Sequence, residues 1–160
     1  MFATIASICR VIMNKAFIRE PDETGDLHCP ACGSLGTAVV RETWQAHVAA
    51  PDETQLADAA FFCPYDKCDV VYFDMFERMV RTEALRHGVY PKDPQAPLCG
   101  CFGLTVADVE ADIREGGVTR VRAIVEKAKG PDARCRTQSP TGQSCVADVQ
   151  RCYMKLRGSI

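Results

Sequence analysis

The chain has 160 residues, of which 47% are hydrophobic and 25% are charged, and its formal net charge is −2 at pH 7. This length suits one compact domain or two small ones, and the composition is that of an ordinary globular protein. A charge close to zero gives no field that favours nucleic acid or an acidic membrane surface. No apolar run approaches the roughly 20 residues that a membrane-spanning helix needs.

Cysteine is the anomaly in this composition. Ten cysteines in 160 residues indicate either a secreted disulfide scaffold or a reduced metal-binding protein. The start of the sequence, MFATIASICRVIMNK, has no basic leader region and no clear A-x-A cleavage site. We therefore expect a reduced protein of the cytoplasm. The ten cysteines are Cys9, Cys29, Cys32, Cys63, Cys68, Cys99, Cys101, Cys135, Cys145 and Cys152.

Residues 1–26 are expected to form an N-terminal helical segment. Their apolar residues recur near helical spacing, at Phe2, Ile5, Ile8 and Ile12. An acidic loop is expected over residues 18–26, at the end of this segment.

Residues 27–94 are predicted to form a small zinc-ribbon-like β module. Two cysteine pairs, separated by thirty residues, present four thiols at Cys29, Cys32, Cys63 and Cys68. Structural zinc prefers four such ligands at tetrahedral corners, about 2.3 Å from the ion. Residues 36–48 and 69–74 follow the two pairs and are rich in valine, aromatic residues and threonine, which predicts strands. The four cysteines are therefore expected to hold Zn²⁺.

Two other interpretations of these cysteines stay open, namely two disulfides, or a thioredoxin-type redox motif at Cys29 and Cys32. The redox motif normally lies at the start of a helix, whereas here a strand is predicted to follow. Four thiolates leave no open coordination position, so the zinc is expected to be structural and His28 a neighbour rather than a ligand. No catalytic role is assigned to His47, on the predicted strand, or to His87.

Residues 95–160 are predicted to form a helical, helix-turn-helix module, so that the whole chain is α+β. The proline-rich segment 90–97 is expected to act as the linker, because proline removes backbone donors. Thr105 with Asp108 three residues later is a capping-box pattern. Helices are expected from Thr105 to Gly116-Gly117, from a cap at Thr119 to Gly130-Pro131, and from Ser144 through Met154.

The helical module carries a second set of four thiols, in the pattern C-x-C followed by two single cysteines. In an extended C-x-C step, side chains i and i+2 point to the same side. Cys99 and Cys101 are therefore expected to bind one iron of a [2Fe–2S] cluster, and Cys135 and Cys145 the other. Such a cluster carries a net charge of about −2, which helix N-termini after Cys101 and at Cys145 would stabilise.

These motifs resemble two known groups of proteins. PLCGCFG, the capped helix after it and the segment SPTGQSC are similar to the cluster-binding domain of bacterioferritin-associated ferredoxins. The C-x9-C spacing, with CPACG and FFCPYDKCDVVYF, resembles more closely the amino-terminal domain of CopZ-type copper chaperones, in which a zinc module precedes a [2Fe–2S] module. The likeness covers residues 27–152.

The resemblance implies a role in handling copper or another soft heavy metal. It implies that the cluster supplies electrons and reduces Cu²⁺ to Cu⁺, with Cu⁺ bound and passed on. The implied partners are a copper chaperone or a metal-transporting ATPase, and an electron donor of unknown identity; neither nucleic acid binding nor membrane insertion is expected. Full-length family members end in a heavy-metal domain with an M-x-C-x-x-C loop, and no such loop occurs in residues 1–160. Copper delivery by that domain is therefore not carried over.

An alternative function stays open, in which both metal sites are structural and merely build a surface for a protein partner. An enzyme is not indicated beyond an electron carrier or a metal-ion reductase. Cys9 and Cys152 lie outside both sets and are expected to be small buried apolar residues. The functional alternative to this structural role is a transient copper or mercury site at the thiols of these two cysteines.

Overall fold

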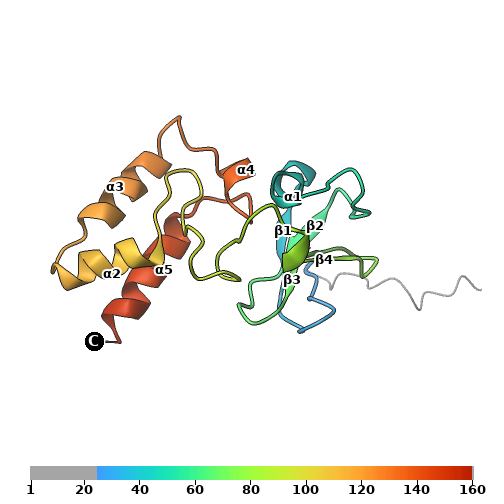
Figure 1. Cartoon of the computed structure of the whole chain (residues 1–160), viewed down its shortest axis with the longest axis horizontal. Helices are drawn as coiled ribbons and strands as arrows, with labels where there is room; N and C mark the ends of the chain where they lie inside the picture. Colours follow the sequence, from blue (N-terminus) through green and yellow to red (C-terminus); the bar gives the residue numbers. More distant parts are fainter. Residues whose placement is uncertain (1–24, 160) are drawn as a thin grey trace, which may run out of the picture.

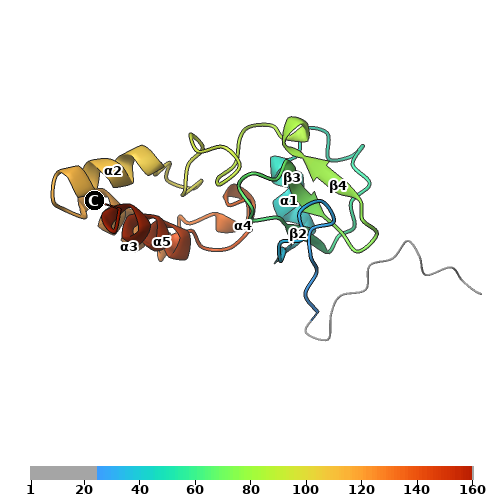
Figure 2. The same ribbon diagram turned by 90° about the horizontal axis from the view of Figure 1, so that it is seen from below.

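The computed structural model describes residues 25–159 as an α+β chain of two lobes (Figures 1 and 2). The first lobe holds a four-stranded antiparallel sheet with strand order β1-β2-β3-β4, and the second is built from helices. The expected order, a small β module before a helical one, is confirmed. The helix expected near the N-terminus, and Cys9 with it, lie outside the described residues.

The elements are short, as expected for a chain in which cysteine turns and prolines interrupt regular structure. Within residues 25–159, no helix is both long and apolar enough to cross a membrane. The strands are β1 Thr37–Val39, β2 Ala60–Phe62, β3 Val70–Phe73 and β4 Met79–Arg81, and the helices are α1 Arg41–His47, the 3-10 helix η2 Thr82–Ala84, α2 Val106–Arg114, α3 Thr119–Ala128, α4 Cys135–Gln138 and α5 Val146–Arg157.

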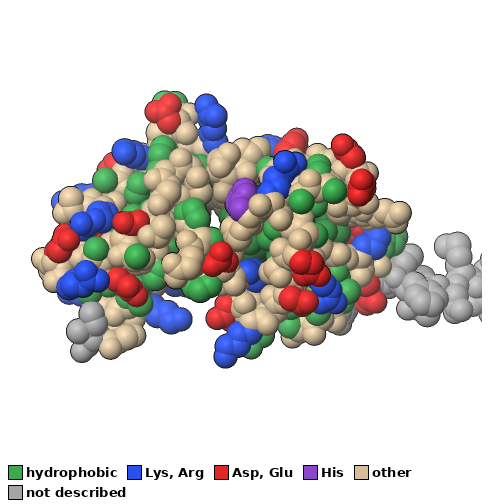
Figure 3. Space-filling view, viewed as in Figure 1, with side chains coloured by type: hydrophobic (Ala, Val, Ile, Leu, Met, Phe, Trp, Pro, Cys, Tyr) green, Lys and Arg blue, Asp and Glu red, His purple; other side chains and the backbone are tan. Residues whose placement is uncertain are grey.

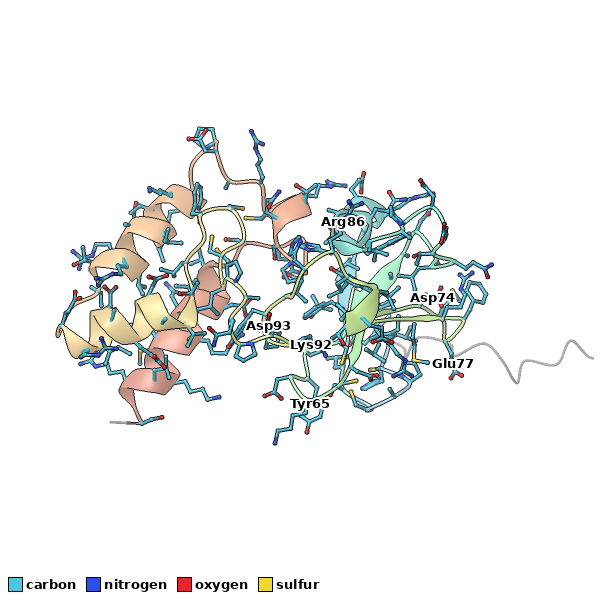
Figure 4. All side chains as sticks on the ribbon, viewed as in Figure 1. Tyr65, Asp74, Glu77, Arg86, Lys92 and Asp93 are labelled. Carbon is cyan, nitrogen blue, oxygen red and sulfur yellow. The ribbon has the colours of Figure 1, made fainter. Side chains whose placement is uncertain are left out.

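Strand β3 is the centre of the first lobe, because every one of its residues is fully buried. Val71 and Tyr72 belong to the main apolar core, together with Trp44 of α1. Val70 and Phe73 belong to a second apolar cluster, which contains Cys29, Cys63 and Cys68. One strand therefore joins the main core to the cysteines. At its far end, the buried Asp74 carboxylate accepts hydrogen bonds from the backbone N–H groups of Phe76 and Arg78 and so closes the turn into β4 (Figure 4).

The prediction of one long strand over residues 36–48 is wrong. Only Thr37–Val39 is a strand, and Arg41–His47 forms helix α1. The segment RETWQAH is rich in good helix formers, and Thr43, Trp44 and His47 share one helical face that is buried in the core. The two valines just before this segment favour a strand, so the sequence pattern extended the predicted strand over residues that form a helix. His47 therefore lies on a helix, with only 3% of its surface exposed.

The linker segment 90–97 forms turns rather than regular structure and is tied to the first lobe. The Lys92 ammonium group donates a hydrogen bond to the Tyr65 carbonyl at 2.5 Å, in the loop between β2 and β3 (Figure 4). Upstream of the linker, the Arg86 guanidinium donates to the Val48 carbonyl at 2.9 Å.

In the second lobe, α2, α3 and α5 pack around a core that includes Val109, Val121 and Val149. The predicted capping box at the start of α2 is present, with the Asp108 N–H donating to the Thr105 hydroxyl and the Thr105 N–H donating to the Asp108 carboxylate. Cys152 is 8% exposed and lies in this core, in agreement with its expected role as a small apolar residue.

The cap of α3 differs from the expectation. Thr119 is the first helical residue, and Val118 before it offers no side-chain cap. The carboxylate of Asp112, on α2, accepts hydrogen bonds from the backbone N–H groups of Arg120 and Val121 at 3.2 and 2.9 Å and from the Arg120 guanidinium at 3.0 Å. A buried side chain from the preceding helix therefore caps α3. Burial opposes the ionisation of Asp112, but these donors outweigh it and lower its pKa.

Replacing this cap should destabilise the second lobe. We expect Asp112→Ala to reduce the free energy of unfolding by about 2–4 kcal/mol, because it leaves two N–H groups of α3 and a guanidinium without their acceptor. Glu115→Ala is the matched control, since it removes the other, exposed carboxylate partner of Arg120 and should cost much less than Asp112→Ala. Chemical denaturation followed by circular dichroism measures both, and equal losses would contradict the role of Asp112.

The same contact gives a pH dependence with a defined sign. The pKa of Asp112 is lowered in the folded state. The contribution of Asp112 to the free energy of unfolding is therefore complete above the ordinary aspartate pKa of about 4 and is lost as the pH falls through the folded pKa. The stability difference between the parent protein and Asp112→Ala should therefore be constant near neutral pH and shrink below about pH 4. A difference that grows on acidification would contradict this assignment.

Candidate metal sites

The four cysteines of the first lobe converge on one point. Cys29 and Cys32 lie in a turn before β1, Cys63 follows β2 directly, and Cys68 lies just before β3. Their four sulfur atoms all lie within 4.8 Å of one another. The Cys29–Cys68 and Cys32–Cys63 sulfur distances are 4.0 and 3.5 Å. Since a tetrahedron with zinc–sulfur bonds of about 2.3 Å has edges of about 3.8 Å, the four sulfurs fit one zinc ion.

The structure favours this arrangement over the two alternatives. All nine cysteines from Cys29 to Cys152 are free thiols, so neither set is joined by disulfides. The turn at Cys29 leads into strand β1 rather than into a helix, unlike a thioredoxin-type motif. His28 is exposed and does not belong to the converging group, as expected for a neighbour of the site.

The site is closed and surrounded by apolar side chains. Cys29 and Cys63 are fully buried, and the cluster around them includes Leu27, Val70 and Phe73. Burial raises the pKa of Cys63 to about 12 and also raises that of Cys68. At Cys32 burial acts in the same sense, but hydrogen bonds with the side chain and backbone of Ser34 and with the neighbouring thiols outweigh it and lower the pKa to about 6. The buried thiols need a cation to hold them as thiolates, and a zinc ion bound by the four sulfurs would supply it.

The second cysteine set begins in a turn with the same backbone pattern as the first. The Cys99 N–H donates to the Leu104 carbonyl and the Gly103 N–H donates to the Cys99 carbonyl, at 3.2 and 2.8 Å. The equivalent two bonds close residues 29–34, both at 2.8 Å. The fifth residue of each turn is a glycine, with φ of +75° and +74°, a value that other residues rarely adopt. The extended C-x-C geometry predicted for residues 99–101 is therefore wrong.

The sulfurs of the second set lie near one another. The Cys101 and Cys135 sulfurs lie 3.8 Å apart. The Cys99 thiol interacts most strongly with that of Cys145 and also with that of Cys101, which lowers the pKa of Cys99 to about 6, while the Cys99 thiol raises the pKa of Cys145. Among residues 25–159, no group of three or more ligands other than the first set converges within 4.8 Å.

Backbone N–H groups point the positive ends of their dipoles at these thiols. The Arg134 N–H donates to the Cys101 sulfur at 3.2 Å, although burial still raises the pKa of Cys101 to about 11. Backbone hydrogen bonds from Phe102 and Cys101 reach the Cys99 sulfur and favour its thiolate. Cys145 is the N-cap residue of α5, so the positive end of a twelve-residue helix lies at this site. Such surroundings favour a negatively charged group at the four sulfurs.

The short helix α4 was not predicted, although its first residue is Cys135. It lies beside α1 of the first lobe rather than in the bundle of α2, α3 and α5 (Figure 1). The two other histidines considered in the sequence play no part in either cysteine set. The rings of His47 and His87 pack edge to face with their centroids 5.9 Å apart, and burial lowers the pKa of His47.

Comparisons with known proteins agree with the first site. Residues 26–86 match the zf_CopZ family, described as a zinc binding domain. The copper chaperone CopZ of Archaeoglobus fulgidus is 27% identical over 127 residues, which are 78% of this chain and 61% of that protein. The chain thus spans less than two thirds of the length of this curated relative.

The fold is shared with a solved structure as well. The X-ray structure of the Archaeoglobus fulgidus CopZ N-terminal domain is similar with a TM-score of 0.66 and 25% sequence identity, over 78% of this chain and 96% of that chain. The protein is therefore a metal-binding protein related to the copper chaperone CopZ, and its first lobe matches a zinc-binding domain.

Gly100 provides a test of how the second site is packed. A Cβ atom at this position would lie 2.0 Å from the Gln138 carbonyl oxygen at the end of α4. We expect Gly100→Ala to force the two cysteine-bearing segments apart and to cost about 1–3 kcal/mol in the free energy of unfolding. Gly117→Ala is the control, because a Cβ there meets nothing closer than 3.8 Å. Denaturation of the two variants should separate them, and equal stabilities would contradict the close approach.

Proposed function

We propose that this protein binds one structural zinc ion and one [2Fe–2S] cluster, and that it transfers electrons in the handling of copper or a related soft metal. The observation that carries the proposal is the sorting of eight thiols into two separate groups, a tetrahedral one in the first lobe and a looser one in the second lobe, where the Cys101 and Cys135 sulfurs lie 3.8 Å apart. One group suits a single ion, and the other suits two metal centres side by side.

The zinc ligands in this proposal are Cys29, Cys32, Cys63 and Cys68. Their burial and their sulfur spacing support a closed, four-coordinate site with no position for a substrate. Zinc binding contributes on the order of 10 kcal/mol to the folding of small cysteine-rich modules. The proposed role of the zinc ion is therefore to hold the first lobe together.

The cluster ligands in this proposal are Cys99, Cys101, Cys135 and Cys145. A [2Fe–2S] cluster requires two thiolates per iron, and the close approach of Cys101 to Cys135 together with the interaction of Cys99 with Cys145 supports this pattern. The backbone N–H groups and the α5 N-terminus around the sulfurs complement a cluster with a net charge of about −2. A single zinc ion fits this set poorly, because the four sulfurs do not share one centre.

The proposed division of the chain follows from these two sites. Residues 27–94 form the zinc-binding module and residues 95–160 the cluster-binding module, which resembles bacterioferritin-associated ferredoxins. The separate apolar cores of the two lobes support this division.

The proposed substrate is copper. When bound, a [2Fe–2S] cluster supplies one electron at a time, and one electron converts Cu²⁺ to Cu⁺, the copper ion that soft thiolates prefer. The relationship to a copper chaperone supports this choice of metal. The proposed partners are a copper chaperone or a metal-transporting ATPase, with an electron donor yet to be identified, in the reducing cytoplasm.

Metal analysis separates this proposal from the alternative of two purely structural sites. Anaerobically purified protein should contain about two iron and two sulfide ions and about one zinc ion per chain, and should be red-brown. Dithionite should bleach the visible absorption reversibly while the zinc stays bound. A colourless protein from its native cells, with zinc in both sites and no redox couple, would establish the alternative.

Cysteine variants test which thiols hold which metal. Cys101→Ser and Cys135→Ala should abolish the visible chromophore and leave about one zinc per chain, because the zinc ligands lie in the other lobe. Cys29→Ser and Cys68→Ser should release the zinc and unfold the first lobe. Cys152→Ala is the control and should keep both metals. Loss of zinc together with iron in Cys101→Ser or Cys135→Ala would show that the partition is wrong.

A further inference from the structure

The segment between the last two cysteines of the second set crosses to the first lobe. Residues 135–145 carry α4 and the loop after it, and α4 packs beside α1 (Figure 1). Next to this contact, a cleft of about 510 Å³ lies between the lobes, lined by Phe62 and Tyr65 on one side, by Asp148 and Arg151 on the other, and by Pro140 of the crossing segment. The space-filling view shows the hollow between the two lobes (Figure 3). Among the helices and strands of residues 25–159, α1 and α4 form the most extensive contact across the two lobes.

The first contact fills a gap that the sequence itself creates in α4. The carbonyl of Arg136 would normally accept the N–H of the residue four positions on, but that residue is Pro140, which has no N–H. The Thr43 hydroxyl of α1 donates to this carbonyl instead, at 2.7 Å. Thr43 is fully buried, so its hydroxyl has no ready access to water as a substitute.

The second contact lies four residues further along the same loop. The Tyr72 hydroxyl of β3 donates to the carbonyl of Pro140 at 2.8 Å. Tyr72 is fully buried, and its burial raises its pKa, so the hydroxyl keeps the proton that it donates. Gly142 also packs directly on Thr43, since a Cβ at Gly142 would lie 2.5 Å from the Thr43 hydroxyl oxygen. The loop is therefore fitted to the surface of the first lobe.

We infer that Thr43 and Tyr72 are positioning residues for the second thiol site. They lie in the zinc-binding lobe, yet they fix the backbone of the loop that brings Cys135 and Cys145 to Cys101 and Cys99. Tyr72 shares strand β3 with Val70, which packs against the cysteines of the first site. Zinc binding thereby orders the surface on which the second site is assembled.

This inference rests on the proposed function only for the identity of the bound group, and its test does not need that group. Thr43→Val and Tyr72→Phe remove the two hydroxyls while keeping the shapes of the side chains. Thr43→Ser restores a hydroxyl at the first position. Thr54→Val is the matched control, because the Thr54 hydroxyl donates to the Ala50 carbonyl at 2.9 Å within the first lobe and does not contact the loop.

The primary measurement is amide hydrogen exchange over residues 137–145 in the full chain loaded with zinc alone. Thr43→Val and Tyr72→Phe should each exchange about fivefold faster there, the equivalent of about 1 kcal/mol for one hydrogen bond, while the parent protein, Thr43→Ser and Thr54→Val should agree. Zinc content should be the same in all of them. Unchanged exchange in both hydroxyl-deleted variants, or equally fast exchange in Thr43→Ser and Thr43→Val, would overturn the inference.

A second measurement uses the protein with iron and sulfide bound, where it forms. Chelator-driven iron release should be about fivefold faster in Thr43→Val and Tyr72→Phe than in the parent protein, and restored in Thr43→Ser. If iron release were unaffected while the loop exchanged faster, the loop contacts would be real but would not position the ligands. A parent protein that takes up no iron would refute the proposed function alone, because the exchange experiment would still decide whether the two hydroxyls fix the loop.

Discussion

The first lobe depends on the meeting of four buried thiols at a single point. Its strands are only three or four residues long, so the sheet contributes few backbone hydrogen bonds of its own. Burial disfavours the thiolate at Cys63 and Cys68, so the sulfurs close around a cation or repel one another if they ionise without one. The proposed zinc ion would resolve this conflict and fix the ends of β2 and β3, which lie next to Cys63 and Cys68. Because every residue of β3 is buried, the order imposed at the cysteines extends into the core that contains Trp44.

The second site uses the same turn for a different arrangement of sulfur. Residues 29–34 and 99–104 share their two closing hydrogen bonds, yet the second cysteine is the fourth residue of one turn and the third residue of the other. Four sulfurs share one centre in the first lobe, whereas the four sulfurs of the second lobe do not all converge on one point. The loop that completes the second site accepts hydrogen bonds from hydroxyls of the first lobe. We therefore expect the geometry of the second site to depend on a folded first lobe.

Features set by neighbouring residues could be predicted from the sequence. The capping box at Thr105 and the order of sheet and helices were found in this way, because each depends on a local pattern. Helix α1 was missed because the valines before it dominated the pattern, and the cap of α3 because its acceptor, Asp112, belongs to another helix. The pairing of the second set of thiols and the bond from Thr43 to Arg136 join residues more than thirty positions apart, which no local pattern encodes.

Anomalous diffraction from crystals of the anaerobically purified protein, recorded at the zinc and iron absorption edges, tests the two-site account most directly. The account predicts one zinc peak equidistant from the sulfurs of Cys29, Cys32, Cys63 and Cys68. It predicts two neighbouring iron peaks, one at the Cys99–Cys145 pair and one at the Cys101–Cys135 pair. A single metal peak shared by the four cysteines of the second lobe, or iron in the first lobe, would contradict it.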